Sequence, residues 1–417
     1  MGSADVVAQS GWRQDVALYF HPRLLGVFLL GFSSGLPLAL TAGTLALWLT
    51  EARVDKTTIG LFALAGTPYT FKFLWSPLID QLPLPGLTRL LGRRRSWLLL
   101  LQFGLMLAIL ALGGADPAVD PSRTALLALL VAFFSASQDI VIDAFRVELL
   151  QPRQYGAGAA MVVLGYRVGM LASGAGALYL ATWYGWATTY LVMAGLMSVG
   201  MLTAWWLPEP EVKEVAASPR EGASRRERLL AWGQRAVVEP FRDFMNRRGW
   251  LWILLFILLF KFGDALAGVM TGPFLVEIGF TKITIANVTK VFGLAATLLG
   301  SVAGGVLVNR LGILSALLWC GLLQMLSNLV FVGLAWWGAG QTEWLVAAIA
   351  AENLAGGMGT AAFVAYLSAL CNQAFTATQY ALLSSFMSFG RTLLASSGGW
   401  MASQMSWAGF FLGTTVA

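Results

Sequence analysis

At least ten ionisable side chains lie within stretches of the sequence that are otherwise apolar. They are Lys72, Asp139, Asp143, Arg146, Glu148, Arg167, Lys261, Asp264, Glu352 and Arg391. A charge at the centre of a membrane helix costs roughly 2.5–3.5 kcal/mol on insertion scales, so each is a candidate for ion binding or proton transfer. For any one residue, structural pairing between neighbouring helices is an equally good explanation. For the whole set, we expect a shared polar cavity.

The apolar stretch around Asp139 carries the densest set of polar side chains. At 100° per residue, one helix face would hold four of them within about 80°, namely Ser135, Asp139, Asp143 and Arg146. Asp143 and Arg146 are three residues apart and can pair. Asp139 is then the better candidate for binding or protonation, with the Gln138 amide beside it. Glu148 points away, toward a neighbouring helix or the interface.

Five further positions extend this pattern to other stretches. Lys261 and Asp264 repeat the three-residue spacing, and we expect a pair that opens when substrate or a proton arrives. Arg167 and Arg391 lie in the middle of the fifth and eleventh apolar stretches, and Lys290 lies nearer the outer end of the eighth. The correspondence of the two arginines fits two related halves.

Composition places these charges in a bilayer. Hydrophobic residues make up 58% of the 417 residues, charged residues only 12%, and the mean hydropathy is +0.71. Such a chain cannot cover a soluble surface with charge, but it can hold roughly a dozen membrane helices of about 20 residues.

Several classes of function are excluded by residues that the sequence lacks. Cys320 and Cys371 are far apart and His21 is the only histidine, so no metal motif, cofactor site or histidine proton relay is expected. No GxxxxGK[ST] loop occurs, which argues against an ATP-driven pump. No helix shows the nucleophile and acid–base groups of a membrane hydrolase, so we expect no enzyme. Nucleic-acid binding has no support either.

The apolar stretches fall into two sets of six, which predict an all-α membrane fold. They lie near 24–49, 58–79, 96–114, 122–150, 156–182, 187–207, 249–277, 284–308, 312–337, 344–371, 376–404 and 407–417. We therefore expect a six-helix bundle over 1–207, a cytoplasmic linker over 208–248 and a second bundle over 249–417. The last stretch has 11 residues, too few to cross, so the twelfth helix looks incomplete.

Loop charges predict the orientation. With the N-terminus in the cytoplasm, 17 of the 27 Lys and Arg residues fall in cytoplasmic segments, 4 in periplasmic segments and 6 within helices. Cytoplasmic loops carry the excess of basic residues in membrane proteins, so this orientation is strongly preferred. The net charge of +6 then reflects loop topology and anionic lipid headgroups.

A loop motif recurs in both halves and resembles the major facilitator signature G-x-L-x-D-R-x-G. The second stretch ends in Ser76-Pro-Leu-Ile-Asp80-Gln, soon followed by Gly92-Arg-Arg-Arg95, and the eighth ends in Gly305-Val-Leu-Val-Asn309-Arg310-Leu-Gly312. The resemblance implies two pseudo-twofold-related bundles with the substrate between them at the midplane. It also implies a set of gating residues: Asp80, Arg93, Arg94, Arg95, Asn309 and Arg310. Ser76 in place of Gly and Asn309 in place of Asp depart from the signature.

Longer motifs are similar to the AmpG family of anhydromuropeptide permeases. They are GFSSGLPLALT from Gly31, FKFLWSPLID from Phe71, SASQDIVIDA from Ser135, GAGAA from Gly156, LGYRVGML from Leu164, FKFGDA from Phe260 and ENLAGGMGT from Glu352. The resemblance spans nearly the whole chain. It implies an inner-membrane importer that takes up muropeptides for cell-wall recycling, driven by the proton motive force and linked to β-lactamase induction. A monomer suffices for this fold.

The resemblance and the charges together give a set of expected roles. Substrate-binding residues are expected at Lys72, Gln138, Asp143, Arg146, Arg167, Lys261, Glu352, Asn353 and Arg391. Proton coupling is expected at Asp139 or Asp264, while Lys72, Arg167 and Lys261 would receive substrate carboxylates. Two alternatives stay open: another major facilitator porter for a sugar, peptide or drug, and a non-transporting membrane assembly factor.

Overall fold

The computed structural model describes residues 18–211, 224–395 and 397–416, and these residues contain helices and no strand. The all-α prediction is confirmed. The first half holds α2 (Pro22–Thr41), α3 (Gly43–Glu51), α4 (Lys56–Leu61), η1 (Phe62–Gly66), α5 (Thr67–Phe71), η2 (Lys72–Leu74), α6 (Ser76–Gln81), α7 (Leu87–Leu91), α8 (Arg93–Gly113), α9 (Pro121–Leu149), η3 (Pro152–Gln154), α10 (Tyr155–Leu171), η4 (Ala172–Gly176), α11 (Ala177–Leu196) and α12 (Ser198–Trp206).

The connecting segment and the second half are helical as well. Between the halves lie α13 (Arg225–Gly233), η5 (Gln234–Val238) and α14 (Glu239–Met245). The second half holds α15 (Trp250–Leu259), α16 (Phe262–Glu277), α17 (Lys282–Ile285), η6 (Ala286–Phe292), α18 (Gly293–Leu311), α19 (Ile313–Trp337), α20 (Thr342–Leu370), α21 (Thr376–Ala395), α22 (Gly398–Gln404) and α23 (Trp407–Val416).

Within the described ranges, eight helical stretches are long and apolar enough to cross a membrane. One of them, Pro152–Trp206, has 55 residues, about 80 Å if straight, against a hydrocarbon core of about 30 Å. It folds back at Gly185, whose φ of 77° and ψ of 169° no helix contains. That positive φ is readily adopted by glycine, so this stretch supplies two antiparallel crossings.

The second expected crossing, residues 56–81, is broken into short helices rather than continuous. Pro68 and Pro77 stand at the first turns of α5 and α6, where the missing N–H of proline is tolerated. Phe71 leaves helical geometry at φ −100° and ψ 7°, and the short 3₁₀ turn η2 begins at Lys72. Irregular backbone at this depth must lie against protein or a polar space. It places the buried Lys72 ammonium beside α9.

Within the first half, glycines let α2 and α10 approach closely. A Cβ on Gly35 would lie 2.0 Å from the carbonyl oxygen of Tyr166, and one on Gly165 would lie 1.9 Å from that of Phe28. Neither contact leaves room for a side chain, which is how small-residue pairs act between membrane helices.

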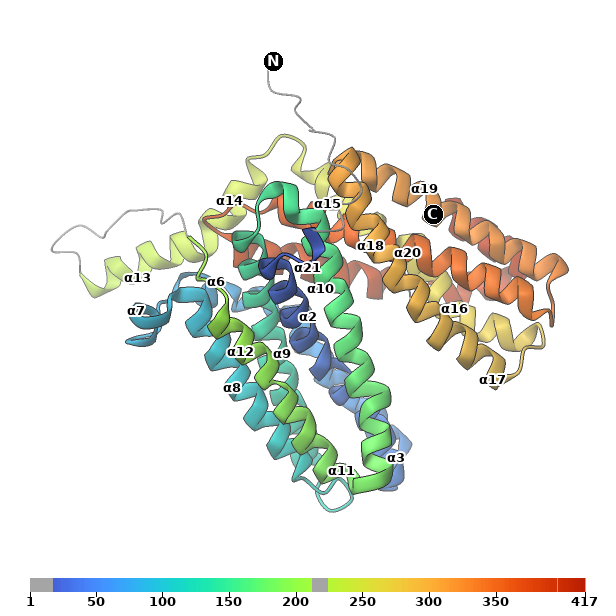
Figure 1. Ribbon diagram of the computed structural model, residues 1–417, viewed down its shortest axis with the longest axis horizontal. Coiled ribbons are helices and arrows are strands. Elements are labelled where there is room, and N and C mark those ends of the chain that lie inside the picture. The colour runs from blue at the N-terminus through green and yellow to red at the C-terminus, as the bar shows by residue number, and fades with distance from the viewer. Residues whose placement is uncertain (1–17, 212–223, 396, 417) are drawn as a thin grey trace.

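The two halves meet at one end of the molecule and diverge toward the other (Figure 1). The end that carries α14 is called the linker end here, and the opposite end, which carries α3 and α17, the far end. Contacts between halves join α10 to α18, and α9 and α6 to α21, near the linker end. The structure is therefore closed at the linker end.

Candidate functional site

A chain of charges in the first half leads from the interior to the linker end. The Lys72 Nζ lies 3.9 Å from one Asp143 carboxylate oxygen, and the Arg146 Nη2 lies 3.5 Å from the other. Asp143 is one-fifth exposed, whereas the other two side chains are buried. Asp143 is thus shared between an interior cation and a cation that contacts the second half.

Arg146 joins the two halves. Its Nη1 donates to the Ser368 Oγ of α20 at 2.8 Å, and its guanidinium lies 5.3 Å from the centre of the Tyr380 ring of α21. At this distance a buried cation and an aromatic face attract each other. From the sequence we expect Arg146 among the substrate-binding residues, and the structure places it where the two halves contact each other. Ser368 and Tyr380 are not charged, and nothing in their local sequence identifies them as its partners.

Asp139 and Gln138 tie α9 to α2. The Ser34 hydroxyl donates to the Asp139 Oδ1 at 2.6 Å, and the Gln138 Nε2 donates to the Ser33 carbonyl oxygen at 2.9 Å. The Gln138 side chain is fully buried. The Gln138 amide therefore binds another helix of the first half.

The second half holds its own charged cluster. Lys261 caps α16 at a break after α15, with φ −110° and ψ 14°. Its Nζ lies 3.5 Å from the Asp264 carboxylate and donates to the Thr360 Oγ1 at 3.0 Å and to the Gly356 carbonyl oxygen at 3.3 Å. The Gln324 amide also donates to Asp264. The expected Lys261–Asp264 pair is present, and it attaches α16 to α20 and α19.

Four other expected site residues lie on the helices α20, α10 and α21. Asn353 accepts a hydrogen bond from the Thr297 hydroxyl at 2.8 Å, which joins α20 to α18. Among the described residues, the neighbouring Glu352 carboxylate makes neither a hydrogen bond nor an ion pair. Arg167 is half-buried in α10 and has a partner. Arg391 lies in α21, and its side chain lies outside the described residues.

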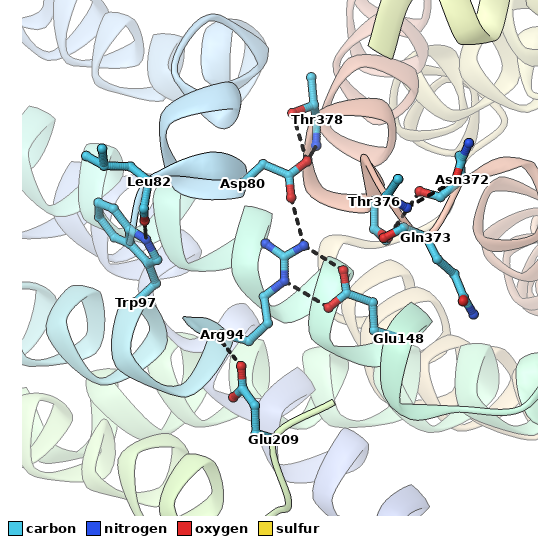
Figure 2. Close-up of polar contacts among 11 residues, drawn as sticks. Asp80, Leu82, Arg94, Trp97, Glu148, Glu209, Asn372, Gln373, Thr376 and Thr378 are labelled. Atoms are coloured by element: carbon cyan, nitrogen blue, oxygen red, sulfur yellow. Dashed lines mark hydrogen bonds and ion pairs between the residues drawn. The ribbon is translucent and has the colours of Figure 1, made fainter. Parts of the chain in front are cut away.

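Asp80 and Arg94, two of the expected gating residues, belong to a buried network at the linker end (Figure 2). The Arg94 Nη2 lies 2.7 Å from Asp80 and 2.6 Å from Glu148, and its Nε donates a second bond to Glu148 at 2.9 Å. The other Asp80 oxygen accepts bonds from the Thr378 backbone N–H at 3.0 Å and from its hydroxyl at 2.9 Å. Thr378 lies in the first turn of α21, where exposed N–H groups favour an anion. Asp80 therefore joins the halves.

Glu209 completes this network and was not found from the sequence. Its carboxylate accepts bonds from the backbone N–H groups of Arg94 at 2.7 Å and Arg95 at 3.0 Å, and so caps α8. Burial raises the pKa of Glu209, although these N–H groups act in the opposite direction. Gly92 is required beside it, because its φ is 88° and a Cβ there would lie 2.3 Å from the Glu209 side chain.

The remaining gating residues have different surroundings. Arg95 donates to the carbonyl oxygens of Ala204 and Trp205 and so fastens α8 to α12. The Arg93 Nε and Nη2 are buried and have no hydrogen bond in the described part of the chain. These two arginines do not bridge the halves in the contacts described.

The second-half counterpart of Asp80 lies at a corresponding place. Asn309 is in the last turn of α18 and faces Gly156 at the start of α10. A Cβ on Gly156 would lie 2.6 Å from the side-chain oxygen of Asn309. Both amide atoms are buried and unbonded within the described ranges. Arg310, which follows it, has a partner. The two halves thus share a position, but only Asp80 makes a charged contact there.

The crossing helices, the matching positions of Asp80 and Asn309 in the two halves and the closure at the linker end fit a membrane transporter of the major facilitator type. Residues 27–337 match the family model of the Major Facilitator Superfamily. A solved structure of the major facilitator transporter FucP in the outward conformation aligns over 96% of both chains with a TM-score of 0.68 and 11% identity. The xylose–proton symporter XylE aligns over 96% of this chain and 94% of its own, with a TM-score of 0.64 and 12% identity.

Closer relatives specify the family. The anhydromuropeptide permease of Escherichia coli K12 is 43% identical over 410 residues, which cover 97% of this chain and 79% of the relative. The putative transporter AmpG 4 of Rickettsia felis is 37% identical over 399 residues, covering 94% of this chain and 93% of the relative. The chain belongs to the AmpG-type permeases of the Major Facilitator Superfamily, which are transporters and not enzymes.

Proposed function

We propose that this chain imports disaccharide–anhydromuramyl peptides by proton symport across the inner membrane of a Gram-negative bacterium. The observation that carries the proposal is the 43% identity with the E. coli anhydromuropeptide permease over 97% of the chain. A monomer suffices, with protons, the peptide and the bilayer as its partners. By delivering muropeptides to cytoplasmic sensing, the transport would also promote β-lactamase induction.

The proposed orientation in the membrane follows from loop charge. The proposed orientation puts 17 basic residues on the cytoplasmic side against 4 on the periplasmic side, so the linker end faces the cytoplasm. The contacts of Asp80 and Arg146 then close the cytoplasmic side, while the far end receives substrate from the periplasm. The domain division expected from the sequence, at 207 and 248, fits two bundles that rock about this contact.

The charge chain through Asp143 links substrate to gate. A substrate carboxylate that binds Lys72 competes with Asp143 for the ammonium group. Asp143 is then left to pair with Arg146, and a closer pair draws the guanidinium away from Ser368. Binding would thereby weaken a contact that holds the two halves together. Arg167 and Lys261 offer further cations for carboxylates of the peptide stem.

Proton coupling has an electrical reason. Moving one negative charge inward against a 100 mV inside-negative potential costs about 2.3 kcal/mol, and each co-transported proton offsets that cost. The sequence predicts that either Asp139 or Asp264 takes up this proton.

Uptake of labelled anhydromuropeptide into right-side-out membrane vesicles tests the function, with inverted vesicles as a control for orientation. We expect uptake in energised right-side-out vesicles that contain the chain, and its collapse when an uncoupler is added. Vesicles that carry Arg94→Met, which breaks the buried network, serve as the protein-containing control. Uptake no greater than in vesicles without the chain would refute the proposal.

A further inference from the structure

We infer that Glu352 is the carboxylate that carries the co-transported proton, in place of the two aspartates expected from the sequence. The inference rests on the proposed function, which supplies the transported proton. The acidic groups on the membrane helices differ in whether they have a partner.

The other interior carboxylates already have partners. Asp143 lies between two cations, Asp264 is paired with Lys261 and accepts a bond from Gln324, and Asp139 accepts the Ser34 hydroxyl. The cations stabilise the ionised forms of Asp143 and Asp264, so taking a proton onto either would give up a favourable contact. Asp139 already uses one carboxylate oxygen to hold α9 to α2 through Ser34.

Glu352 has no such partner in the part of the chain that the structure describes. It is only partly exposed, ten residues into α20 from the far end, which is about 15 Å along the helix. An ionised carboxylate without a counter-charge at this depth is costly, and protonation removes that cost. The halves diverge toward the far end (Figure 1), and we take this as the side from which the proton arrives.

The Lys261 ammonium lies against the face of α20 that carries Glu352. Glu352, Gly356 and Thr360 are spaced four apart and share one side of α20. Lys261 already contacts the last two of these residues. A change in the Lys261 rotamer toward the next turn would bring its ammonium from Asp264 to Glu352. Lys261 therefore offers the ionised Glu352 a partner once the proton has left.

Among the described residues, Asp264 on α16 faces Glu352, and Lys261 at the start of α16 contacts Gly356 and Thr360 on α20. The helices α18 and α19 contribute the neutral Thr297 and Gln324 to this region. The helix α10 also packs against α20, and its Arg167 has a partner of its own. The side chains of Lys290 on η6 and Arg391 on α21 lie outside the described residues.

The proposed step moves one proton and no electrons. A proton from water on the far side forms an O–H bond with the Glu352 carboxylate, and the halves then rock with substrate bound. On the linker side the O–H bond breaks, the proton passes to water, and Lys261 pairs with the carboxylate. The return of the empty transporter restores the Lys261–Asp264 pair.

Counterflow separates this role from substrate binding. Glu352→Gln mimics the protonated acid, so proteoliposomes should lose accumulation of anhydromuropeptide driven by a proton gradient by at least about tenfold. Exchange of external labelled for internal unlabelled anhydromuropeptide should stay within about twofold of wild type, because exchange needs no net proton release. Glu352→Asp should recover part of the accumulation. Glu343→Gln, at an exposed position on the same helix, is the matched control and should leave both activities unchanged.

Three results would overturn the inference. They are accumulation that persists in Glu352→Gln, loss of both accumulation and exchange, and transfer of the phenotype to Asp264→Asn or Asp139→Asn. If wild type transports no muropeptide, the proposed function fails and infrared difference spectra still test the proton site. In detergent at neutral pH, a protonated-carboxyl band should be present in wild type and Glu343→Gln and absent in Glu352→Gln. An unchanged band in Glu352→Gln contradicts the assignment.

Discussion

Replacing Asp80 with Asn should release the linker-end contact between the halves. Asp80 accepts two bonds from Thr378 across the halves and one from Arg94 within its own half. The substitution removes the charge that strengthens all three, while Arg94 keeps its two bonds to Glu148. Hydrogen bonds to charged groups contribute about 1.5–3 kcal/mol each, so a loss of about 2–3 kcal/mol is expected. This shifts the ratio of closed to open linker end by about 30- to 160-fold.

Electron–electron distance measurements can read this shift. Spin labels at Leu90 and Leu314 would report it, because both side chains are highly exposed and lie on opposite halves near the linker end. Cys320 and Cys371 would first be replaced by alanine, so that only the introduced cysteines carry labels. Wild type should give one main distance, and Asp80→Asn should add a longer population. Thr378→Val should produce part of the same change.

A second carboxylate provides the control. Asp243 also lies at the linker end and accepts bonds from Asn372 and Gln379, but these join the linker to the second half alone. Asp243→Asn should therefore leave the distance distribution unchanged. The reasoning is refuted if Asp80→Asn gives the wild-type distribution, or if Asp243→Asn broadens it equally.

Three further predictions follow from the packing and the charges. Lys261→Met should lower the melting temperature in detergent, because the unpaired Asp264 costs about 1–3 kcal/mol of stability. The double variant Lys261→Met with Asp264→Asn should recover most of this loss in the same thermal unfolding assay. Gly35→Ala should destabilise the protein by about 3 kcal/mol in the same assay, because the new Cβ would lie 2.0 Å from a carbonyl oxygen. The Cβ of Gly43→Ala would meet nothing within 4 Å, so this control should be neutral. Equal melting temperatures for the two variants would contradict the packing. Burial raises the pKa of Glu209 above 4.5, so folding favours the protonated form of this side chain. As pH rises from below 4.5 toward 7, wild type should therefore lose stability relative to Glu209→Gln. Melting temperatures of the two proteins that change in parallel with pH would argue against this.

The helices could be predicted from the sequence because a bilayer imposes a local requirement. Each crossing must satisfy its own backbone, so length and hydropathy mark most helices directly. The pairs Asp143–Arg146 and Lys261–Asp264 also followed from spacing, since residues three apart share a helix face. The breaks near Lys72 and Lys261 depended on prolines and on packing, which a hydropathy pattern does not report.

Contacts between the halves could not be predicted in the same way. Thr378 lies 298 residues from Asp80, and Ser368 lies 222 residues from Arg146. Such partners are set by how two bundles pack, and uncharged threonine and serine give no signal in a single sequence. The cap that Glu209 provides for α8 was missed for the same reason, since it joins the end of one crossing to the start of another.

The most direct test of coupled transport is to measure whether a substrate gradient alone drives protons into proteoliposomes. Proteoliposomes with a pH-sensitive dye inside and no imposed gradient would receive external anhydromuropeptide. We expect the interior to acidify when the chain is present, with no acidification on addition of fucose or xylose and none in empty liposomes. Uptake of labelled anhydromuropeptide without any change in internal pH would contradict proton symport, and the absence of both would contradict the assignment of the substrate.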